Sequence, residues 1–219
     1  EIPVLDPKAD LLMFHTQYGT VKVNYKENYD DAKVYNNWSL QIYDRSRNMK
    51  VDPVWLYKQQ SRKPVRLQQF KSIINGYEQF KTMELEDGQR TPDRLDFTDM
   101  VERYITNGLV IPFKVLMVDE AQDLTPLQWD MVVKIAKQVN RVYIAGDDDQ
   151  TIYTFQGADP KIFIDLKGHL DPQIQSRRVP RVIHELAESI FPHMSQRLEK
   201  QWQPRDAEGE IHENINYQD

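Results

Sequence analysis

The hydrophobic and polar positions of this chain form their clearest pattern between residues 115 and 158. Two short apolar runs, at residues 115–118 and 142–145, are separated by a segment in which apolar residues recur at helical spacing. This order predicts a strand, a helix and a second strand of a parallel sheet. Because both runs are continuously apolar, we expect the strands to be buried on both faces of that sheet.

The start of the intervening helix carries three agreeing signals. Thr125 can accept hydrogen bonds as an N-cap, Pro126 suits the first helical position, and Gln128 completes a capping box. The periodicity predicts a helix that runs to about Val139. Its expected buried residues are Leu127, Met131, Val132 and Ile135.

Other periodic segments predict further elements. An apolar stripe at helical spacing covers residues 67–80, and its aromatic members Phe70, Tyr77 and Phe80 are expected in the core. Helices are also predicted at residues 95–105 and directly after Pro180. Residues 160–166 form a short mixed element, residues 20–25 and 209–217 alternate like strands, and the polar stretch 84–93 is a candidate linker.

Acidic residues follow both predicted strands. Asp119 and Glu120 come directly after the first strand, and residues 147–149 are three aspartates that follow the second strand and Gly146. The carboxyl ends of parallel strands meet at one sheet edge, where one carboxylate can hold a divalent cation and another can handle a proton. Gln150, on the neighbouring strand end, is placed to sense a terminal phosphate.

Composition changes this picture only in part. With 219 residues, 40% of them hydrophobic, the chain can form a core, and the net charge of −6 does not exclude nucleic-acid binding through a local basic face. The absence of cysteine excludes disulfides and thiolate metal sites. No long apolar run and no signal-peptide pattern occurs, so we expect a soluble, cytoplasmic protein with no membrane partner.

Residues 45–81 differ from the rest of the chain in charge. Nine basic residues face two acidic ones, and five aromatic residues are interleaved with them. Such a segment favours binding to a single strand of nucleic acid, with Arg62, Lys63 and Arg66 as candidate backbone contacts. The alternative is that the aromatic residues serve only the core.

Two quoted stretches carry a resemblance to a known family. DEAQDLTPLQ (119–128) and AGDDDQTIYTFQGADP (145–160) resemble the second and third helicase motifs of superfamily 1 DNA helicases of the UvrD/Rep type. LDFTDM (95–100) is similar to the DF-x-DL segment that precedes those motifs, and QSRRVP (175–180) is similar to the fourth motif. The resemblance covers about residues 94–190.

The resemblance implies a fold and a function. The expected fold is α/β, with part of a RecA-like P-loop NTPase-type parallel sheet and a mostly helical accessory subdomain. Residues 1–90 would form the accessory subdomain, residues 91–170 the carboxyl-terminal part of the first motor domain, and residues 171–219 the start of the second. The parent protein would use ATP and Mg²⁺ to move along single-stranded DNA and to unwind duplex at junctions with single strands, in the bacterial or viral nucleoid.

The resemblance also implies roles in nucleotide hydrolysis. Asp119 would coordinate Mg²⁺, and Glu120 would be the catalytic base. Gln150 would contact the γ-phosphate and couple it to DNA, and Arg178 would reach the same phosphate from the second motor domain. The alternative for Arg178 is an ordinary surface salt bridge. Ser176 and Arg177 stand before it where the family usually has Asn-Tyr.

Two aromatic residues are implied in DNA binding. Tyr153 and Phe155 would stack on bases of single-stranded DNA, and their alternative role is ordinary packing. Gln156 stands where the family usually has arginine, so one cationic contact near the DNA path is absent.

One motif of the family does not occur in the sequence. No Gly-x-x-x-x-Gly-Lys-Ser/Thr is present, and none of the eight glycines precedes a lysine. This motif supplies the phosphate cradle, its lysine and a Mg²⁺-binding hydroxyl. We therefore expect an internal fragment of a helicase that does not turn over ATP at an appreciable rate by itself.

Two functions of other classes remain open. In a Mg²⁺-dependent nuclease, Asp119, Glu120, Asp123 and the aspartates at 147–149 would hold metal ions and cleave DNA without nucleotide. A non-catalytic module would instead bind single-stranded DNA through residues 45–81, in a salt-sensitive way that is indifferent to Glu120.

Overall fold

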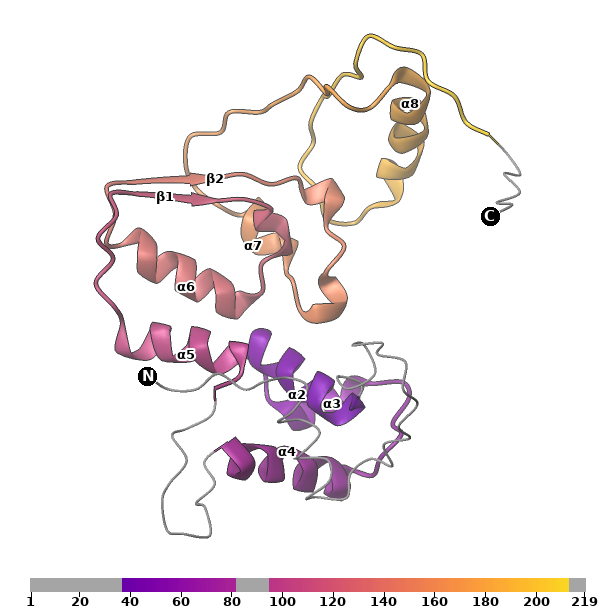
Figure 1. Cartoon of the computed structure of the whole chain (residues 1–219). Helices are drawn as coiled ribbons and strands as arrows, with labels where there is room; N and C mark the ends of the chain where they lie inside the picture. Colours follow the sequence, from indigo (N-terminus) through magenta and orange to yellow (C-terminus); the bar gives the residue numbers. More distant parts are fainter. Residues whose placement is uncertain (1–36, 82–94, 213–219) are drawn as a thin grey trace, which may run out of the picture.

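The computed structural model describes residues 37–81 and 95–212. Figure 1 shows three groups of elements, with helices α2 to α4 at one end, a two-stranded sheet with α6 and α7 in the middle, and α8 at the other end. The helices are α2 Trp38–Asn48, α3 Pro53–Gln59, α4 Leu67–Lys81, α5 Phe97–Asn107, α6 Pro126–Ala136, α7 Pro160–Ile164 and α8 Arg181–Ile190. The strands are β1 Val115–Val118 and β2 Arg141–Ile144.

Several expected elements fall where the structure gives no description. The strand-like segment 20–25 and the candidate linker 84–93 lie outside the described residues. Of the expected strand at 209–217, residues 209–212 are described and are not in a strand.

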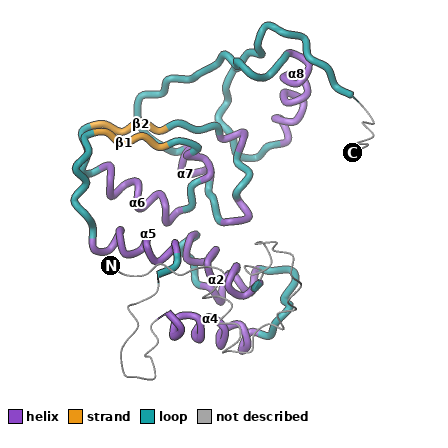
Figure 2. The backbone as a smooth tube through the Cα atoms, viewed as in Figure 1, coloured by secondary structure: helices purple, strands orange, loops and turns teal. Residues whose placement is uncertain are grey.

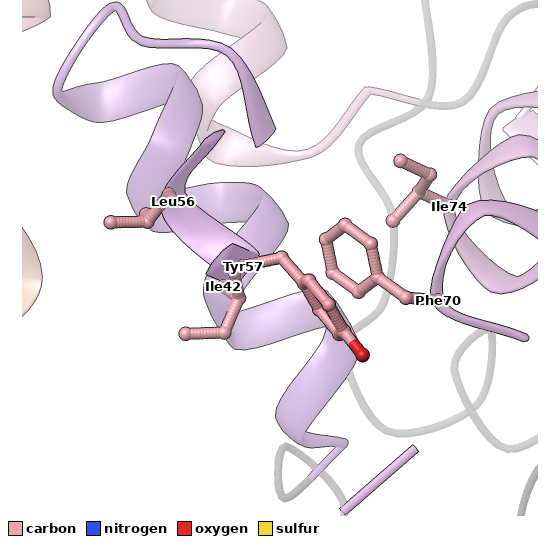
Figure 3. Close-up of a cluster of buried hydrophobic side chains, with 5 residues drawn as sticks. All are labelled: Ile42, Leu56, Tyr57, Phe70 and Ile74. Atoms are coloured by element: carbon pink, nitrogen blue, oxygen red, sulfur yellow. The ribbon is translucent and has the colours of Figure 1, made fainter. Parts of the chain in front are cut away.

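The helices α2, α3 and α4 share an apolar core. Figure 3 shows five of its side chains, and the rings of Tyr57 and Phe70 lie with their centroids 5.0 Å apart. Phe70 and Phe80 on α4 are fully buried, and Tyr77 is nearly so. The helical stripe and the core positions expected for the three aromatic residues of α4 are therefore confirmed.

A buried ionic network joins α2, α4 and α5. Arg47 on α2 pairs with Asp96 at 2.8 Å, with Asp99 at 2.5 Å and with Glu102 at 2.8 Å. Lys81 at the end of α4 pairs with Asp99 at 2.8 Å. Burial alone would raise the pKa of the Asp96 carboxyl, but the charges of Arg47 and Lys81 outweigh it and lower that pKa.

The two strands are parallel, with Val115 paired to Arg141 and Val118 paired to Ile144. Helix α6 begins with the expected capping box, in which Thr125 accepts from Gln128 N and the Gln128 side chain accepts from Thr125 N. Among the residues expected to be buried, Leu127 and Val132 are buried, whereas Met131 and Ile135 are only partly so. Trp129 joins them in the core.

One face of the sheet is covered and the other is open in the described part of the chain. Leu116, Val118 and Ile144 pack against the core that contains Trp129 and Val132. On the opposite face, Met117 is 78% exposed and Tyr143 is 53% exposed. The expectation of strands buried on both faces is therefore wrong here, because helices α6 and α7 cover a single face (Figure 1).

Helix α8 stands apart from the sheet. Figure 2 shows that long irregular segments lead to it and away from it. The returning segment is anchored on α8, because the rings of His184 and Trp202 lie 4.3 Å apart and a ring nitrogen of His184 lies 2.9 Å from the Trp202 carbonyl oxygen. Within the described ranges, no helix is both long and apolar enough to span a membrane.

Candidate functional site

The loops that follow β1 and β2 lie side by side at one edge of the sheet. Ala145 N donates to the Val118 carbonyl oxygen at 2.8 Å, and Ala121 N donates to the Ala145 carbonyl oxygen at 3.0 Å. Because the strands are parallel, their carboxyl ends meet at this edge, as the sequence predicts. The acidic residues after the two strands are thereby brought together.

Asp119 and Glu120 are both exposed at this edge. Asp119 Oδ1 accepts a hydrogen bond from Glu120 N at 2.9 Å, and Glu120 Oε2 accepts one from Gln122 Nε2 at 2.8 Å. Glu120 has φ 50° and ψ 40°, in the left-handed region that few residues other than glycine adopt. This conformation turns the chain sharply out of β1 and into the short helix η2 Ala121–Asp123.

Gln122 links the two loops, a role that the sequence motif alone does not reveal. Its side chain is 1% exposed, and its Oε1 accepts a hydrogen bond from Asp147 N at 3.0 Å. The same amide therefore holds the Glu120 carboxylate on one side and the backbone of the second loop on the other. The only sequence signal is an uncharged polar residue inside the quoted stretch DEAQD.

The second loop contains Gln150 and the three aspartates. Gln150 is exposed, and its Nε2 donates to an oxygen of Asp147. Burial would raise the pKa of the Asp147 carboxyl, but hydrogen bonds from Lys200 and Gln150 outweigh it and lower that pKa. Lys200 also pairs with Asp148, and Arg197 pairs with Asp149 at 2.9 Å. Sequence reasoning missed both basic residues.

The acids proposed for a nuclease do not converge on a common point. Asp123 Oδ1 accepts from Ile152 N at 3.3 Å, so this residue supports the following loop. The aspartates at 147–149 are engaged by basic side chains. Among the residues that the structure describes, no three His, Asp or Glu side chains are grouped as ligands of one metal ion.

Tyr153 and Phe155 lie in the loop that Asp123 supports. Their side chains are 41% and 63% exposed, and their ring centroids are 6.0 Å apart. The alternative of ordinary core packing is therefore not supported for either residue. The loop rests on α2, because Arg45 Nη2 donates to the Thr154 carbonyl oxygen at 3.4 Å and a Cβ on Gly157 would lie 2.8 Å from the Met49 side chain.

Arg178 faces the same open cleft as Asp119 and Gln150. The cleft measures about 2540 Å³, well above the roughly 300–1,000 Å³ of closed small-molecule sites, because it extends from the sheet edge to α8. Glu120 is not part of the lining of this cleft. Arg178 is exposed, and no ion pair ties it to another residue of the described ranges.

The basic residues of segment 45–81 fall into two sets, one of which binds other parts of the chain. Arg45, Arg47, Lys50 and Lys81 bind other parts of the chain: the Thr154 carbonyl, the α5 carboxylates and Asp130. The remaining basic residues, all of them exposed, are Lys58, Arg62, Lys63, Arg66 and Lys71. The candidate nucleic-acid surface is thus the α3–α4 connection and its surroundings rather than the whole segment.

Comparison with known proteins gives one family. The profile described as UvrD/REP helicase N-terminal domain matches residues 5–171. Similar curated proteins include DNA helicase II of Haemophilus influenzae, with 33% identity over 92 residues, and the ATP-dependent DNA helicase Rep of Salmonella typhimurium, with 44% identity over 46 residues. A DNA helicase II homolog of Mycoplasma genitalium is 24% identical over 160 residues.

These matches cover unequal shares of the two partners. They include 40%, 21% and 65% of this chain, respectively, but 13%, 7% and 23% of the three relatives. The chain therefore corresponds to a small part of the length of each relative.

Proposed function

The chain belongs to the UvrD/REP helicase N-terminal domain family, and on that premise we propose that it carries the hydrolytic side of the nucleotide site of an ATP-dependent DNA helicase. The observation that carries the proposal is the shared sheet edge, where Asp119 after β1 and Gln150 after β2 face one cleft. Carboxylate and amide groups at the carboxyl edge of a parallel sheet are suited to a Mg²⁺-bound phosphate.

The side chains at this edge fit a Mg²⁺–nucleotide complex. Asp119 uses one oxygen for Glu120 N, and its other oxygen is available for a metal ion that keeps waters and phosphate oxygens as its remaining ligands. When bound, Mg²⁺ neutralises charge that develops on the phosphates. Glu120 would accept a proton from the attacking water, Gln150 would contact the terminal phosphate, and Arg178 would reach that phosphate from the side of α8.

The remaining surfaces suggest where DNA would bind. We propose that Tyr153 and Phe155 stack on bases of a single strand, and that Arg62, Lys63 and Arg66 contact the phosphate backbone near a junction with duplex. Exposed, adjacent rings on a supported loop favour the first assignment. Exposed positive charge favours the second.

The domain division follows from the same proposal. Helices α2 to α4 would belong to the accessory subdomain within residues 1–90. Residues 91–170, with β1 and β2, would be the carboxyl-terminal part of a RecA-like motor domain, and residues 171–219 would begin the second motor domain. The parallel pair with helices on one face supports this division.

The first test is steady-state ATP hydrolysis by the 219-residue chain, with and without single-stranded DNA, against Glu120→Gln. The sequence has no Gly-x-x-x-x-Gly-Lys-Ser/Thr, and phosphoryl transfer depends almost entirely on positioning and charge around the phosphates. We therefore expect turnover no higher than that of Glu120→Gln. A longer parent protein should hydrolyse ATP, and Glu120→Gln should slow it by at least about a hundredfold.

Two other outcomes would change the proposal. DNA-stimulated hydrolysis by the chain itself, lost in Glu120→Gln, would keep the helicase assignment but would place a phosphate cradle among these residues. Cleavage of DNA with Mg²⁺ and without nucleotide would favour the nuclease instead.

The second test concerns DNA binding. Loss of one stacked ring costs roughly 1–3 kcal/mol, so Phe155→Ala should weaken binding of a single-stranded oligonucleotide about five- to hundredfold. Fluorescence anisotropy at fixed salt measures the change. Phe113→Ala is the matched control, because Phe113 is also exposed but lies outside the loop. Equal effects of the two variants would contradict the role of Phe155.

A non-catalytic binding module remains a second candidate, favoured by the five exposed basic residues around the α3–α4 connection. It predicts that reversing the charges of Arg62, Lys63 and Arg66 abolishes the salt-sensitive binding, while Phe155→Ala has no effect. The two candidates thus differ in the effect of Phe155→Ala, because both place the three basic residues on the nucleic acid.

A further inference from the structure

The three aspartates after β2 form a single docking site for a short basic segment, residues 197–200. Their six carboxylate oxygens all accept hydrogen bonds, five of them from residues 197–200 and the sixth from Gln150. Asp148 is 2% exposed and Asp149 is 6% exposed at the side chain. Such complete engagement of buried carboxylates indicates a built contact rather than a chance meeting of surface charges.

Arg197 and Lys200 bind different aspartates of this docking site. Arg197 binds Asp149 with both arms, Nε at 2.9 Å from Oδ1 and Nη2 at 3.0 Å from Oδ2. Lys200 Nζ lies 2.6 Å from Asp148 Oδ1 and also reaches Asp147. Leu198 N donates to Asp148 Oδ2 at 2.6 Å, so the backbone of the segment is held as well. Planar, two-armed pairing fixes orientation in addition to distance.

The basic segment is itself fixed to the α8 side of the molecule. The Arg197 guanidinium lies 4.4 Å from the centroid of the Phe191 ring at the end of α8. Trp202, two residues beyond Lys200, packs against both His184 and Phe191. The contact therefore joins the sheet edge to α8 as a unit, across the irregular connections seen in Figure 1.

The docking site also contacts Gln150, the candidate contact of the terminal phosphate. Asp147 binds Lys200 through one oxygen and Gln150 through the other. Burial raises the pKa of Asp147, but hydrogen bonds from Lys200 and Gln150 and the charge of Lys200 hold it below its usual value. Lys200, Asp147 and Gln150 thus form a continuous line from the α8 side to the cleft.

We propose that Arg197 and Lys200 are positioning residues that dock the α8 unit on the three aspartates and orient Gln150 through Asp147. The docking part depends only on the contacts described above. The orientation of Gln150 rests on the proposed function, because only that function gives Gln150 a role, the contact with the terminal phosphate. The aspartates at 147–149 serve as an internal docking site and not as metal ligands.

The absence of cysteine allows a direct test of docking. Lys137→Cys at the end of α6 and Ser189→Cys on α8 introduce two exposed labelling sites in the full chain. Spin labels at these sites report the distance distribution between the sheet and α8 by pulsed electron paramagnetic resonance. We expect one narrow distribution, and we expect Lys200→Met to broaden it.

Arg181→Gln is the matched control. Arg181 also forms an ion pair, but its partner Glu208 lies on the same side of the molecule, and both residues are exposed. It should leave the distribution unchanged. If Lys200→Met loses its helical circular dichroism, the combined substitutions Arg197→Gln and Asp149→Asn, which remove both charges of one ion pair, replace it and should also broaden the distribution. An unchanged distribution in a folded variant, or equal broadening in Arg181→Gln, would overturn the docking role.

The orientation of Gln150 needs a separate readout. Its side-chain amide signal, identified by its loss in Gln150→Ala, should shift in the ¹H–¹⁵N spectrum of Lys200→Met and stay in place in Arg181→Gln. A broadened distance distribution with an unmoved amide signal would overturn the positioning of Gln150 and leave docking intact. Neither measurement involves nucleotide or DNA, so failure of the proposed helicase function would be seen separately.

Discussion

Gln122 is the residue on which the geometry of the candidate site most depends. It connects loops whose contacting residues lie 25 positions apart, and both ends of its amide are engaged. A buried amide that loses one partner costs about 1–3 kcal/mol, so small displacements around it should be measurable.

Gly146→Ala tests this dependence. An added Cβ would lie 2.6 Å from Gln122 Oε1 and 3.0 Å from Phe163 Cζ, so the amide must move away from Asp147 N. We expect the free energy of unfolding to fall by about 1–3 kcal/mol, measured by urea denaturation. Gly168→Ala is the control, because nothing lies within 4 Å of its added Cβ. A similar change in both variants would show that Gln122 tolerates displacement.

At the residue scale, the sequence predicts where a site residue lies better than it predicts which residues that side chain contacts. The convergence of Asp119 and Gln150 could be predicted, because parallel strands end at one edge. Gln122, Arg197 and Lys200 could not, because the pattern around each residue carries no signal of a contact that is distant in sequence. The exposure of Tyr153 and Phe155 likewise depends on which elements cover their loop.

At the scale of elements, ion pairs join the helices in addition to apolar packing. The Arg47 side chain is 10% exposed and forms ion pairs with carboxylates at the start of α5. Lys81, at the end of α4, also pairs with them. Removing one partner from a buried ionic network leaves the other charges uncompensated.

Arg47→Met should therefore lower the free energy of unfolding by about 3–5 kcal/mol at neutral pH. Urea denaturation measures the difference, and Arg66→Met, at an exposed position, should change stability by less than about 0.5 kcal/mol. Equal stability of the two variants would mean that the network contributes nothing net.

The difference should also depend on pH. The folded-state pKa of Asp96 is lowered, so its contribution to stability is present above its unfolded pKa and is lost as pH falls through the folded value. The gap between wild type and Arg47→Met should thus narrow below about pH 4. A gap that widens in acid would contradict the assigned pairing.

Element boundaries show where pattern fails. The start of α6 could be predicted because capping residues act locally. Its end at Ala136, before the expected Val139, could not, because the turn into β2 is fixed by a distant partner. Asn140 N donates to the Lys114 carbonyl oxygen at 2.8 Å. Apolar Val139 continues the helical pattern but lies in that turn.

At the scale of the whole molecule, the open face of the sheet is the main departure from expectation. A continuous apolar run indicates that both faces of a strand can be buried. Whether each face is buried depends on the other elements that pack against it. Among the described residues, α6 and α7 supply that cover for one face only. Exposed apolar side chains of this kind mark a surface suited to association.

Neighbouring residues of β1 allow a matched comparison. Met117→Lys should change the free energy of unfolding by less than about 0.5 kcal/mol, because its side chain already lies in solvent. The same substitution at Leu116, which packs against the core, should cost about 3 kcal/mol or more. Met117→Lys should also reduce binding of an apolar fluorescent dye. Similar losses of stability would indicate that both faces are covered.

The left-handed backbone at Glu120 has a further consequence. Most residues other than glycine are disfavoured there by on the order of 1–2 kcal/mol, and asparagine is one of the few that adopt this conformation readily. Replacing the proposed base with asparagine should therefore relieve backbone strain, but it also removes the hydrogen bond that Glu120 Oε2 accepts from Gln122 Nε2. The backbone strain at this position and the hydrogen bond to Gln122 thus act on stability in opposite directions, so the glutamate is held there by its side-chain contact and not by its backbone preference.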